Sequence, residues 1–368
     1  MSAMKSLANG SDLLRPGIRS VQATAVSTIR SRAPLRLGFG GGGTDLSPFC
    51  DLHGGAVLNC TIDRYAYCYV TPRNDMKVIF DARDKGVTEC HAFGTPIDSS
   101  FGLRLHRGIF NRFLEDGVLS RSTGVTIVTT ADALAGSGLG TSSALVVAMC
   151  EAMREYAGAP LGRYELAHLA FEIERRELRL AGGKQDQYSA AFGGVNFIEF
   201  FDQDRVIVNP LRVHRNILLE LEASLVICFT GLSRDSDAII DAQISRIVSK
   251  DAGVVEAMLS LKEAAFAMKR ALLAGDLCAF GDTLNRSWLS KKSTAATISN
   301  DLIERLLKIG HDAGAYACKV SGAGGGGFLL FMTPPERKSE LIGALNVAGG
   351  EATPVRLTED GVEAWTQP

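Results

Sequence analysis

The sequence predicts an α+β protein with two domains, and three observations support this fold class. At 368 residues the chain is long for a single hydrophobic core, so two domains are expected. Strand-like and helix-like segments occur in groups, which favours mixed sheets over a strictly alternating βαβ array. Glycine-rich stretches at 38–43, 136–140 and 322–327 interrupt these groups and predict loops that another molecule can approach closely.

Composition and charge exclude several classes of function. Hydrophobic residues make up 46% of the chain and charged residues 22%, as in soluble globular proteins. No apolar run is long enough to span a membrane, and the net charge of −2 argues against nucleic acid or an anionic membrane as the main partner. The eight cysteines form no C-x-x-C pair, which predicts reduced thiols and a cytoplasmic protein. The sequence leaves a homodimer open.

The first half of the chain is predicted to be rich in strands. Residues 1–28 have no continuous apolar segment and are expected to form a flexible tail, not a signal peptide. Apolar patterning and composition then predict strands at 31–37, 56–59, 65–71, 77–80, 124–130 and 195–200. Helical spacing predicts helices at 103–114, 144–156 and 163–180. A charged turn at 202–205 is taken as the boundary between a domain at 29–205 and a second at 206–368.

The second half is predicted to be richer in helices. Helical patterns occupy 237–249, 254–274, 277–289, 301–313 and 336–346. Strands are predicted at 225–229, 317–320, 328–332 and 353–357. No segment repeats at a fixed period, so a solenoid or a repeat array is not expected.

The second glycine-rich stretch is the strongest functional signal in the chain. Glycines on alternate positions allow the backbone to approach an anion, and three hydroxyl residues follow where a helix exposes unpaired N–H groups. This arrangement predicts a phosphate-binding loop made of Gly136, Ser137, Gly138, Leu139, Gly140, Thr141, Ser142 and Ser143. The alternative is a glycine-rich turn in which a hydroxyl side chain merely caps the helix.

Two other nucleotide-binding motifs are excluded. The stretches at 38–43 and 322–327 both match G-x-G-x-x-G, but that fingerprint must open a helix within a βαβ unit. The first runs into Thr44 and Asp45, and the second into a predicted strand. The stretch at 136–140 has no lysine before its hydroxyls and is therefore not a Walker A loop, so backbone N–H groups must carry the phosphate charge.

Phosphoryl transfer also needs a base and a cation, and the sequence offers candidates for both. Asp186 lies in a short amide-rich stretch flanked by glycines and is the candidate base, with Arg36 as its cation. Asp45 could accept hydrogen bonds from substrate hydroxyls. The structural alternatives are a helix N-cap for Asp186 and an Asx-turn for Asp45.

A divalent cation has candidate ligands as well. Ser142 or Thr141 could offer a hydroxyl to Mg²⁺, with Glu172 or Glu174 as the acidic ligand. The alternative for either glutamate is a solvated charge on an amphipathic helix.

The three glycine motifs together resemble those of the GHMP kinase superfamily. The matching segments are 33–45, 136–144 and 319–327, and the resemblance covers nearly the whole chain except the tail. It implies a ribosomal protein S5-like N-terminal ATP-binding domain and a ferredoxin-like C-terminal domain with the active site between them. It further implies ATP as co-substrate, Asp186 as catalytic base with Arg36 beside it, and Ser142 as a Mg²⁺ ligand. Glu174 fits the second ligand, although its spacing to Asp186 is one residue longer than in mevalonate-type members.

Within this superfamily the sequence is most similar to the D-glycero-D-manno-heptose 7-phosphate kinase branch. Gly42 and Gly43 stand where galactokinase-like members have Glu-His, and segments 182–188, 230–234 and 288–292 also match the branch. The resemblance implies transfer of phosphate from ATP to the anomeric hydroxyl of the heptose, for lipopolysaccharide or capsule precursors. The expected substrate-binding residues are Gly42, Gly43, Thr44, Asp45, Lys184, Arg234, Gly324 and Gly325.

The phosphate that such a substrate already carries requires a further cation, and the sequence does not rank the candidates. They are Lys184, Arg234, Lys291 and Lys292. Two rival functions stay open: a kinase for an unphosphorylated sugar such as fucose or mannose, and a non-catalytic sensor of sugar and nucleotide on the same scaffold.

Overall fold

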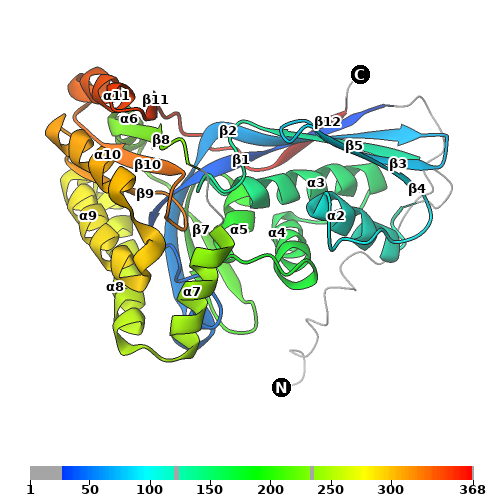
Figure 1. The fold of residues 1–368 in the computed structure, drawn as a ribbon, viewed down its shortest axis with the longest axis horizontal. Helices are drawn as coiled ribbons and strands as arrows, with labels where there is room; N and C mark the ends of the chain where they lie inside the picture. Colours follow the sequence, from blue (N-terminus) through cyan, green and yellow to red (C-terminus); the bar gives the residue numbers. More distant parts are fainter. Residues whose placement is uncertain (1–26, 120–123, 233–235, 367–368) are drawn as a thin grey trace.

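The computed structural model describes residues 27–119, 124–232 and 236–366. It contains a large sheet with helices beneath it and a smaller sheet beside a stack of long helices (Figure 1). The expected tail lies almost wholly outside the described residues, and so does Arg234. None of the helices in the described ranges has the length and apolar character that a membrane span requires.

The large sheet has eight strands. Their order is β12-β1-β2-β5-β3-β4, with β6 paired to the far part of β2 and β7 paired to β6. All neighbours are antiparallel except β3 and β5. The strands are β1 (Ile29–Gly40), β2 (Gly55–Arg73), β3 (Lys77–Ala82), β4 (Val87–Ala92), β5 (Gly124–Ala131), β6 (Val195–Phe200), β7 (Val206–Pro210) and β12 (Glu363–Thr366).

Helices cover one face of the large sheet (Figure 1). The central helix is α3, which packs against β1 and β2 and buries almost all of its apolar residues. The helical elements of this half are α1 (Phe49–His53), α2 (Arg104–Glu115), α3 (Thr141–Ala157), α4 (Arg163–Phe171), a π-helix (Glu172–Glu177) and α5 (Gln185–Phe192). Burial of this sheet face and helix α3 forms the main hydrophobic core.

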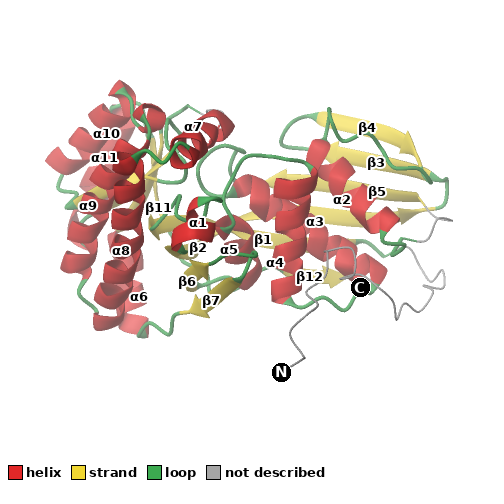
Figure 2. Cartoon of the chain, turned by 90° about the horizontal axis from the view of Figure 1, so that it is seen from below, coloured by secondary structure: helices red, strands yellow, loops and turns green. Residues whose placement is uncertain are grey.

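The small sheet is antiparallel throughout, in the order β11-β8-β10-β9. Its strands are β8 (Leu225–Phe229), β9 (Ala317–Val320), β10 (Phe328–Met332) and β11 (Glu351–Pro354). The accompanying helices are α6 (Arg215–Ser224), α7 (Ser236–Val248), α8 (Ala252–Ala274), α9 (Leu277–Thr294), α10 (Asp301–Asp312) and α11 (Lys338–Val347). Helices α8 to α11 stand together at one end of the molecule (Figure 2).

The two sheets do not divide the chain at residue 205. Strand β7 begins at Val206 but pairs with β6, and β12 returns from the end of the chain to pair with β1. The edge of β1 has unpaired backbone groups that a short strand can satisfy, and sequence distance does not prevent this pairing. The C-terminal segment therefore completes the first sheet.

Two local expectations also differ from the structure. The first glycine stretch does not begin as a loop, because β1 continues to Gly40 and its backbone pairs with Asn59 and Leu58 of β2. The helix expected at 163–180 ends as α4 at Phe171 and continues as the π-helix. A π-helix accommodates an additional residue within its turn, which changes the direction of the side chains that follow.

Candidate active site

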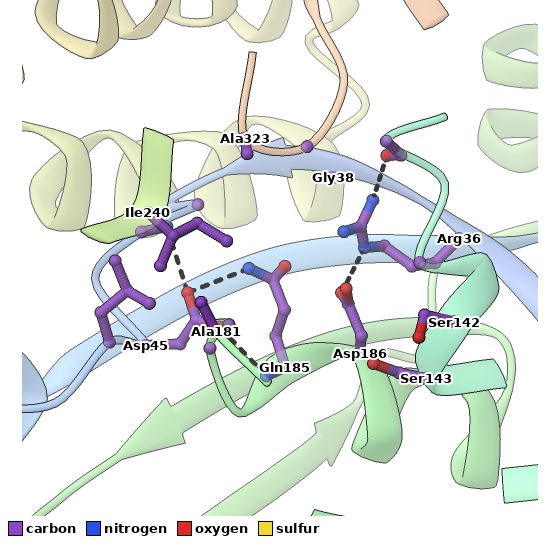
Figure 3. Close-up of a pocket in the computed structure, with 18 of the residues that line it drawn as sticks. Arg36, Gly38, Asp45, Ser142, Ser143, Ala181, Gln185, Asp186, Ile240 and Ala323 are labelled. Carbon is purple, nitrogen blue, oxygen red and sulfur yellow. Dashed lines mark hydrogen bonds and ion pairs between the residues drawn. The ribbon is translucent and has the colours of Figure 1, made fainter. Parts of the chain in front are cut away.

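The three glycine-rich stretches meet around a cavity of about 330 Å³. Its wall includes residues from β1, the loop after it, the start of α3, the π-helix, the start of α5 and the third glycine stretch. In Figure 3, Asp186 lies between Ser142 and Asp45. Residues far apart in sequence therefore form one site.

The second glycine stretch packs directly on the third. Gly138 has a positive φ of 85°, and a side chain there would overlap the carbonyl oxygen of Ser321. The Ser321 hydroxyl and the Arg36 guanidinium donate to the Gly138 carbonyl at 2.8 and 2.7 Å. Only glycine permits this approach. The contact joins the two halves of the chain at the cavity.

The start of α3 is open to an anion. Its N-cap is Gly140 in the left-handed conformation, and no side chain caps the helix. The hydroxyl-cap alternative is therefore wrong, and Thr141, Ser142 and Ser143 lie in the first turn, facing the cavity. Uncapped N–H groups and the helix dipole favour a phosphate here. Ser137 and Leu139 are buried and do not line the cavity.

Asp186 and Arg36 form an ion pair at the cavity wall. The Arg36 Nε lies 2.7 Å from the Asp186 Oδ1 (Figure 3). Asp186 is in the first turn of α5, whose N-cap is Lys184, so the N-cap alternative for Asp186 is wrong. Its other oxygen, Oδ2, has no hydrogen-bond partner among the described residues. That oxygen is free to accept a proton or a hydrogen bond from a bound hydroxyl.

Glu174, and not Glu172, faces Ser142. The Ser142 Oγ donates to the Glu174 Oε1 at 3.0 Å, and Gln187 donates to the Oε2 at 2.7 Å. Glu174 is fully buried, which excludes the solvated alternative for it. Glu172 pairs instead with Arg176 at 2.9 Å and does not line the cavity. The π-helix can absorb the extra residue between Glu174 and Asp186.

The oxygens of Ser142 and Glu174 fit a magnesium ion. Mg²⁺ prefers hydroxyl, carboxylate and phosphate oxygens and keeps several waters, so two protein ligands are sufficient. Both side chains line the cavity beside the open start of α3.

Asp45 lies on the other side of Asp186 from Ser142 and is held there by hydrogen bonds (Figure 3). Its carboxylate accepts from the backbone N–H of Gln185 at 3.1 Å and from the Gln185 side-chain amide at 3.0 Å (Figure 3). It also accepts from the N–H of Gly43 at 3.1 Å. Gly42 and Gly43 line the cavity with it. An Asx-turn alone therefore does not account for Asp45, because two of its three hydrogen bonds come from Gln185 in a different segment.

Four expected substrate residues in the described part of the chain do not line this cavity. Thr44 is buried and exchanges hydrogen bonds with the backbone of Ala56. Gly324 and Gly325 pack on Ile298, and Gly325 donates its N–H to that residue's carbonyl at 2.8 Å. These residues shape the loops around the site without lining it. Lys184 lies in a neighbouring cavity, considered below.

Two buried lysines add positive charge to the cavity. Lys291 donates to the Gly42 carbonyl at 2.9 Å, and Lys319 donates to the Gly38 carbonyl at 2.7 Å. Burial lowers the pKa of Lys291 to about 8 and that of Lys319 to about 7. A bound anion would favour the charged form of both. Lys292, in contrast, pairs with Glu304 and does not line the cavity.

Lys319 was not among the residues expected to bind a ligand. The signal that could have identified it is a lysine in the short apolar strand β9, directly before the third glycine stretch. A charged residue at a buried strand position needs a partner or a function.

Gly183 supports Asp45 and gives a sharp steric prediction. Its φ is not in the left-handed region, so alanine fits the backbone, but an added Cβ would overlap the Asp45 carboxylate. We expect Gly183→Ala to displace the Asp45 carboxylate and so to lower kcat/KM for the sugar about a hundredfold. The KM for ATP should stay within about threefold of the wild-type value. Steady-state kinetics measure both. Gly343→Ala, with open space in α11, is the control. Equal loss toward both substrates would contradict the expectation that Asp45 binds the sugar.

Comparison with known proteins places the chain in a family. The model of the GHMP kinases N terminal domain matches residues 104–194, and that of the GHMP kinases C terminal matches 268–349. A D-glycero-alpha-D-manno-heptose 7-phosphate kinase of Campylobacter jejuni is 42% identical over 341 residues, which is 92% of this chain and 99% of that protein. The chain belongs to the GHMP kinase family. This GHMP kinase is therefore a phosphotransferase that uses ATP and an alcohol acceptor.

Solved structures agree with this family. A D-glycero-D-manno-heptose 1-phosphate kinase from Bacteroides thetaiotaomicron is 40% identical with a TM-score of 0.77, covering 92% of this GHMP kinase and 98% of that chain. The Methanococcus jannaschii mevalonate kinase is 17% identical with a TM-score of 0.72, and the match covers 92% of this GHMP kinase and 100% of that chain. The latter likeness shows the fold alone. The predicted two-domain GHMP kinase fold is confirmed.

Proposed function

We propose that this GHMP kinase transfers the γ-phosphate of ATP to the anomeric hydroxyl of D-glycero-D-manno-heptose 7-phosphate. The product would be heptose 1,7-bisphosphate, a precursor of nucleotide-activated heptose for lipopolysaccharide or capsule in the cytoplasm. One observation carries the proposal: the Arg36–Asp186 pair lies between an open helix N-terminus and the Asp45 carboxylate. The 42% identity to the Campylobacter jejuni relative supports the heptose phosphate as substrate.

Asp186 takes the proton of the attacking hydroxyl in this proposal. Its Oδ1 is occupied by Arg36, so the ion pair fixes the carboxylate and leaves Oδ2 for the substrate. An anomeric hydroxyl is more acidic than other sugar hydroxyls, so a carboxylate is an adequate base. Arg36 also stabilises negative charge on the transferring phosphoryl group.

The N–H groups at the start of α3 hold the phosphates on the other side of Asp186. Ser142 and Glu174 would bind Mg²⁺ next to them, and the bound ion would neutralise charge on the β- and γ-phosphates. Lys291 and Lys319 add positive charge to the same cavity. Together these groups orient the phosphates toward a hydroxyl held between Asp186 and Asp45.

The choice of acceptor is tested by kinetics with four sugars. We expect release of ADP with heptose 7-phosphate at a kcat/KM about a hundredfold above that for mannose or fucose, because charge-assisted hydrogen bonds to a phosphate contribute up to about 3 kcal/mol. Phosphorus NMR should show a new phosphate coupled to the anomeric proton. Heptose 1-phosphate, whose anomeric position is blocked, should not react. Turnover that favours an unphosphorylated sugar or heptose 1-phosphate would overturn the proposal.

A further inference from the structure

A second cavity, of about 620 Å³, adjoins the first one. The two share the wall formed by Asp45, Arg175, Asp237 and residues 180–182. Asp186, Arg36 and Ser142 line only the first cavity. The second cavity therefore begins at the sugar-binding end of the site, beyond Asp45. A sugar whose reacting hydroxyl lies at Asp186 would extend its opposite end toward it.

The second cavity contains basic and acidic side chains in similar numbers. The basic residues are Arg175, Arg176, Arg179 and Lys184, and the acidic residues are Asp45, Asp51, Asp204, Asp237 and Asp241. An anion can therefore be held only next to a basic group that is not already neutralised. The partners of each basic residue decide which group this is.

Three of the four basic residues have partners. Lys184 lies 3.3 Å from the Asp51 carboxylate and 3.0 Å from that of Asp204, and its side chain is buried. Arg176 pairs with Glu172 at 2.9 Å and also with Asp204. These pairings remove Lys184 from the candidates for an unpaired phosphate-binding cation.

Arg175 also has partners, which are Glu174 and the loop that separates the two cavities. Its guanidinium lies 3.2 Å from the Glu174 carboxylate. It donates to the carbonyls of Ala181 and Gly183 at 3.2 and 3.3 Å. Arg175 therefore holds the loop in place.

Arg179 is different from the other three. It is exposed, lines the second cavity, and makes no hydrogen bond or ion pair with any described residue. Its φ of 52° is in the left-handed region, which is uncommon for a long side chain and occurs often at functional sites. It lies two residues beyond Glu177, where the π-helix ends, and next to residues 180–182 of the shared wall.

We propose that Arg179 binds the phosphate at the distal end of the sugar substrate and so determines the preference for a sugar phosphate. This inference rests on the proposed function. The guanidinium presents paired N–H donors that match phosphate oxygens, and no carboxylate in the described part of the chain contacts it. Asp241 on α7, which lines the second cavity and not the first, repels an anion from that part of the cavity. The phosphate is thereby confined to the loop that carries Arg179.

The test compares wild type with Arg179→Asn, because asparagine tolerates a positive φ and removes the charge. We expect the KM for heptose 7-phosphate to rise about 10- to 100-fold and kcat to change less than about threefold. The preference for heptose 7-phosphate over mannose should fall by the same factor. Arg179→Lys should recover part of the loss, since it keeps the charge without the paired donors. Arg270→Asn, an exposed arginine of α8 outside both cavities, is the matched control.

The outcomes separate this inference from the proposed function. A wild-type enzyme that does not prefer heptose 7-phosphate over mannose contradicts the proposed function itself. If wild type has the preference and folded Arg179→Asn retains it, Arg179 is not the phosphate ligand and the inference is overturned. If Arg179→Asn has a lowered melting temperature, Arg179→Gly, which also fits the positive φ, gives the deciding KM. A fall in kcat without a rise in KM overturns the inference as well.

Discussion

Asp186→Asn is expected to lower kcat about 10³-fold, with little change in the KM for ATP or sugar. The substitution keeps the size of the side chain and removes its ability to accept a proton, and general base catalysis typically contributes 10²- to 10⁴-fold. Asparagine also leaves the buried Arg36 guanidinium without its anion at 2.7 Å. Release of ADP at saturating substrate measures the effect.

A control variant and a double-mutant cycle test whether the loss of kcat is specific to Asp186. Asp282→Asn, at an exposed position of α9, should keep wild-type kcat. In a double-mutant cycle, Arg36→Lys and Asp186→Asn should be strongly non-additive, because the two side chains act as one pair. A kcat for Asp186→Asn within about threefold of wild type would exclude Asp186 as the base.

Glu174→Gln is expected to raise the Mg²⁺ concentration needed for half-maximal activity about a hundredfold. The substitution removes the one negative charge that contacts Ser142, and Mg²⁺ binds neutral amide oxygens less tightly than carboxylates. kcat/KM at about 1 mM Mg²⁺ should fall by a similar factor and recover in part as Mg²⁺ is increased. A titration of activity against Mg²⁺ at fixed ATP measures both.

The matched control lies two residues away in the same π-helix. Glu172 is also buried and ion-paired, but it contacts Arg176 and His168 outside the cavity. Thermal unfolding compares the stability of Glu172→Gln directly with that of Glu174→Gln, and Glu172→Gln should leave the Mg²⁺ titration unchanged. An equal shift in both variants would show that the effect is structural and that Glu174 is not a metal ligand.

Much of the site could be predicted because glycines and hydroxyl residues indicate the backbone conformation of their own segment. The stretch at 136–143 combines positive-φ glycines with hydroxyls at a helix start, and each feature depends only on neighbouring residues. The candidates Asp186, Arg36 and Asp45 each lie within three residues of a glycine. Their residue types and order were sufficient to indicate phosphoryl transfer.

Other choices could not be made from local patterns. Glu172 and Glu174 lie on different faces of a helix, and the sequence does not show which face meets the second glycine stretch; in the structure the π-helix packs against α2 and directs Glu174 to Ser142. The lysines at 184, 291 and 292 were likewise equal as candidates until their partners were known. A lysine paired with two aspartates and a lysine facing a cavity have the same sequence signature.

The sequence alone determined the fold class, the three glycine stretches and the kinds of side chain that surround a phosphate. The tertiary structure decided which of these side chains meet: Arg36 with Asp186 across 150 residues, β12 with β1, and Lys319 with the first glycine stretch. The reason is that backbone conformation follows from nearby residues, whereas burial and ion pairing depend on the packing of distant elements. Arg179 shows the difference most clearly, because its lack of a partner among the described residues is a property of the fold.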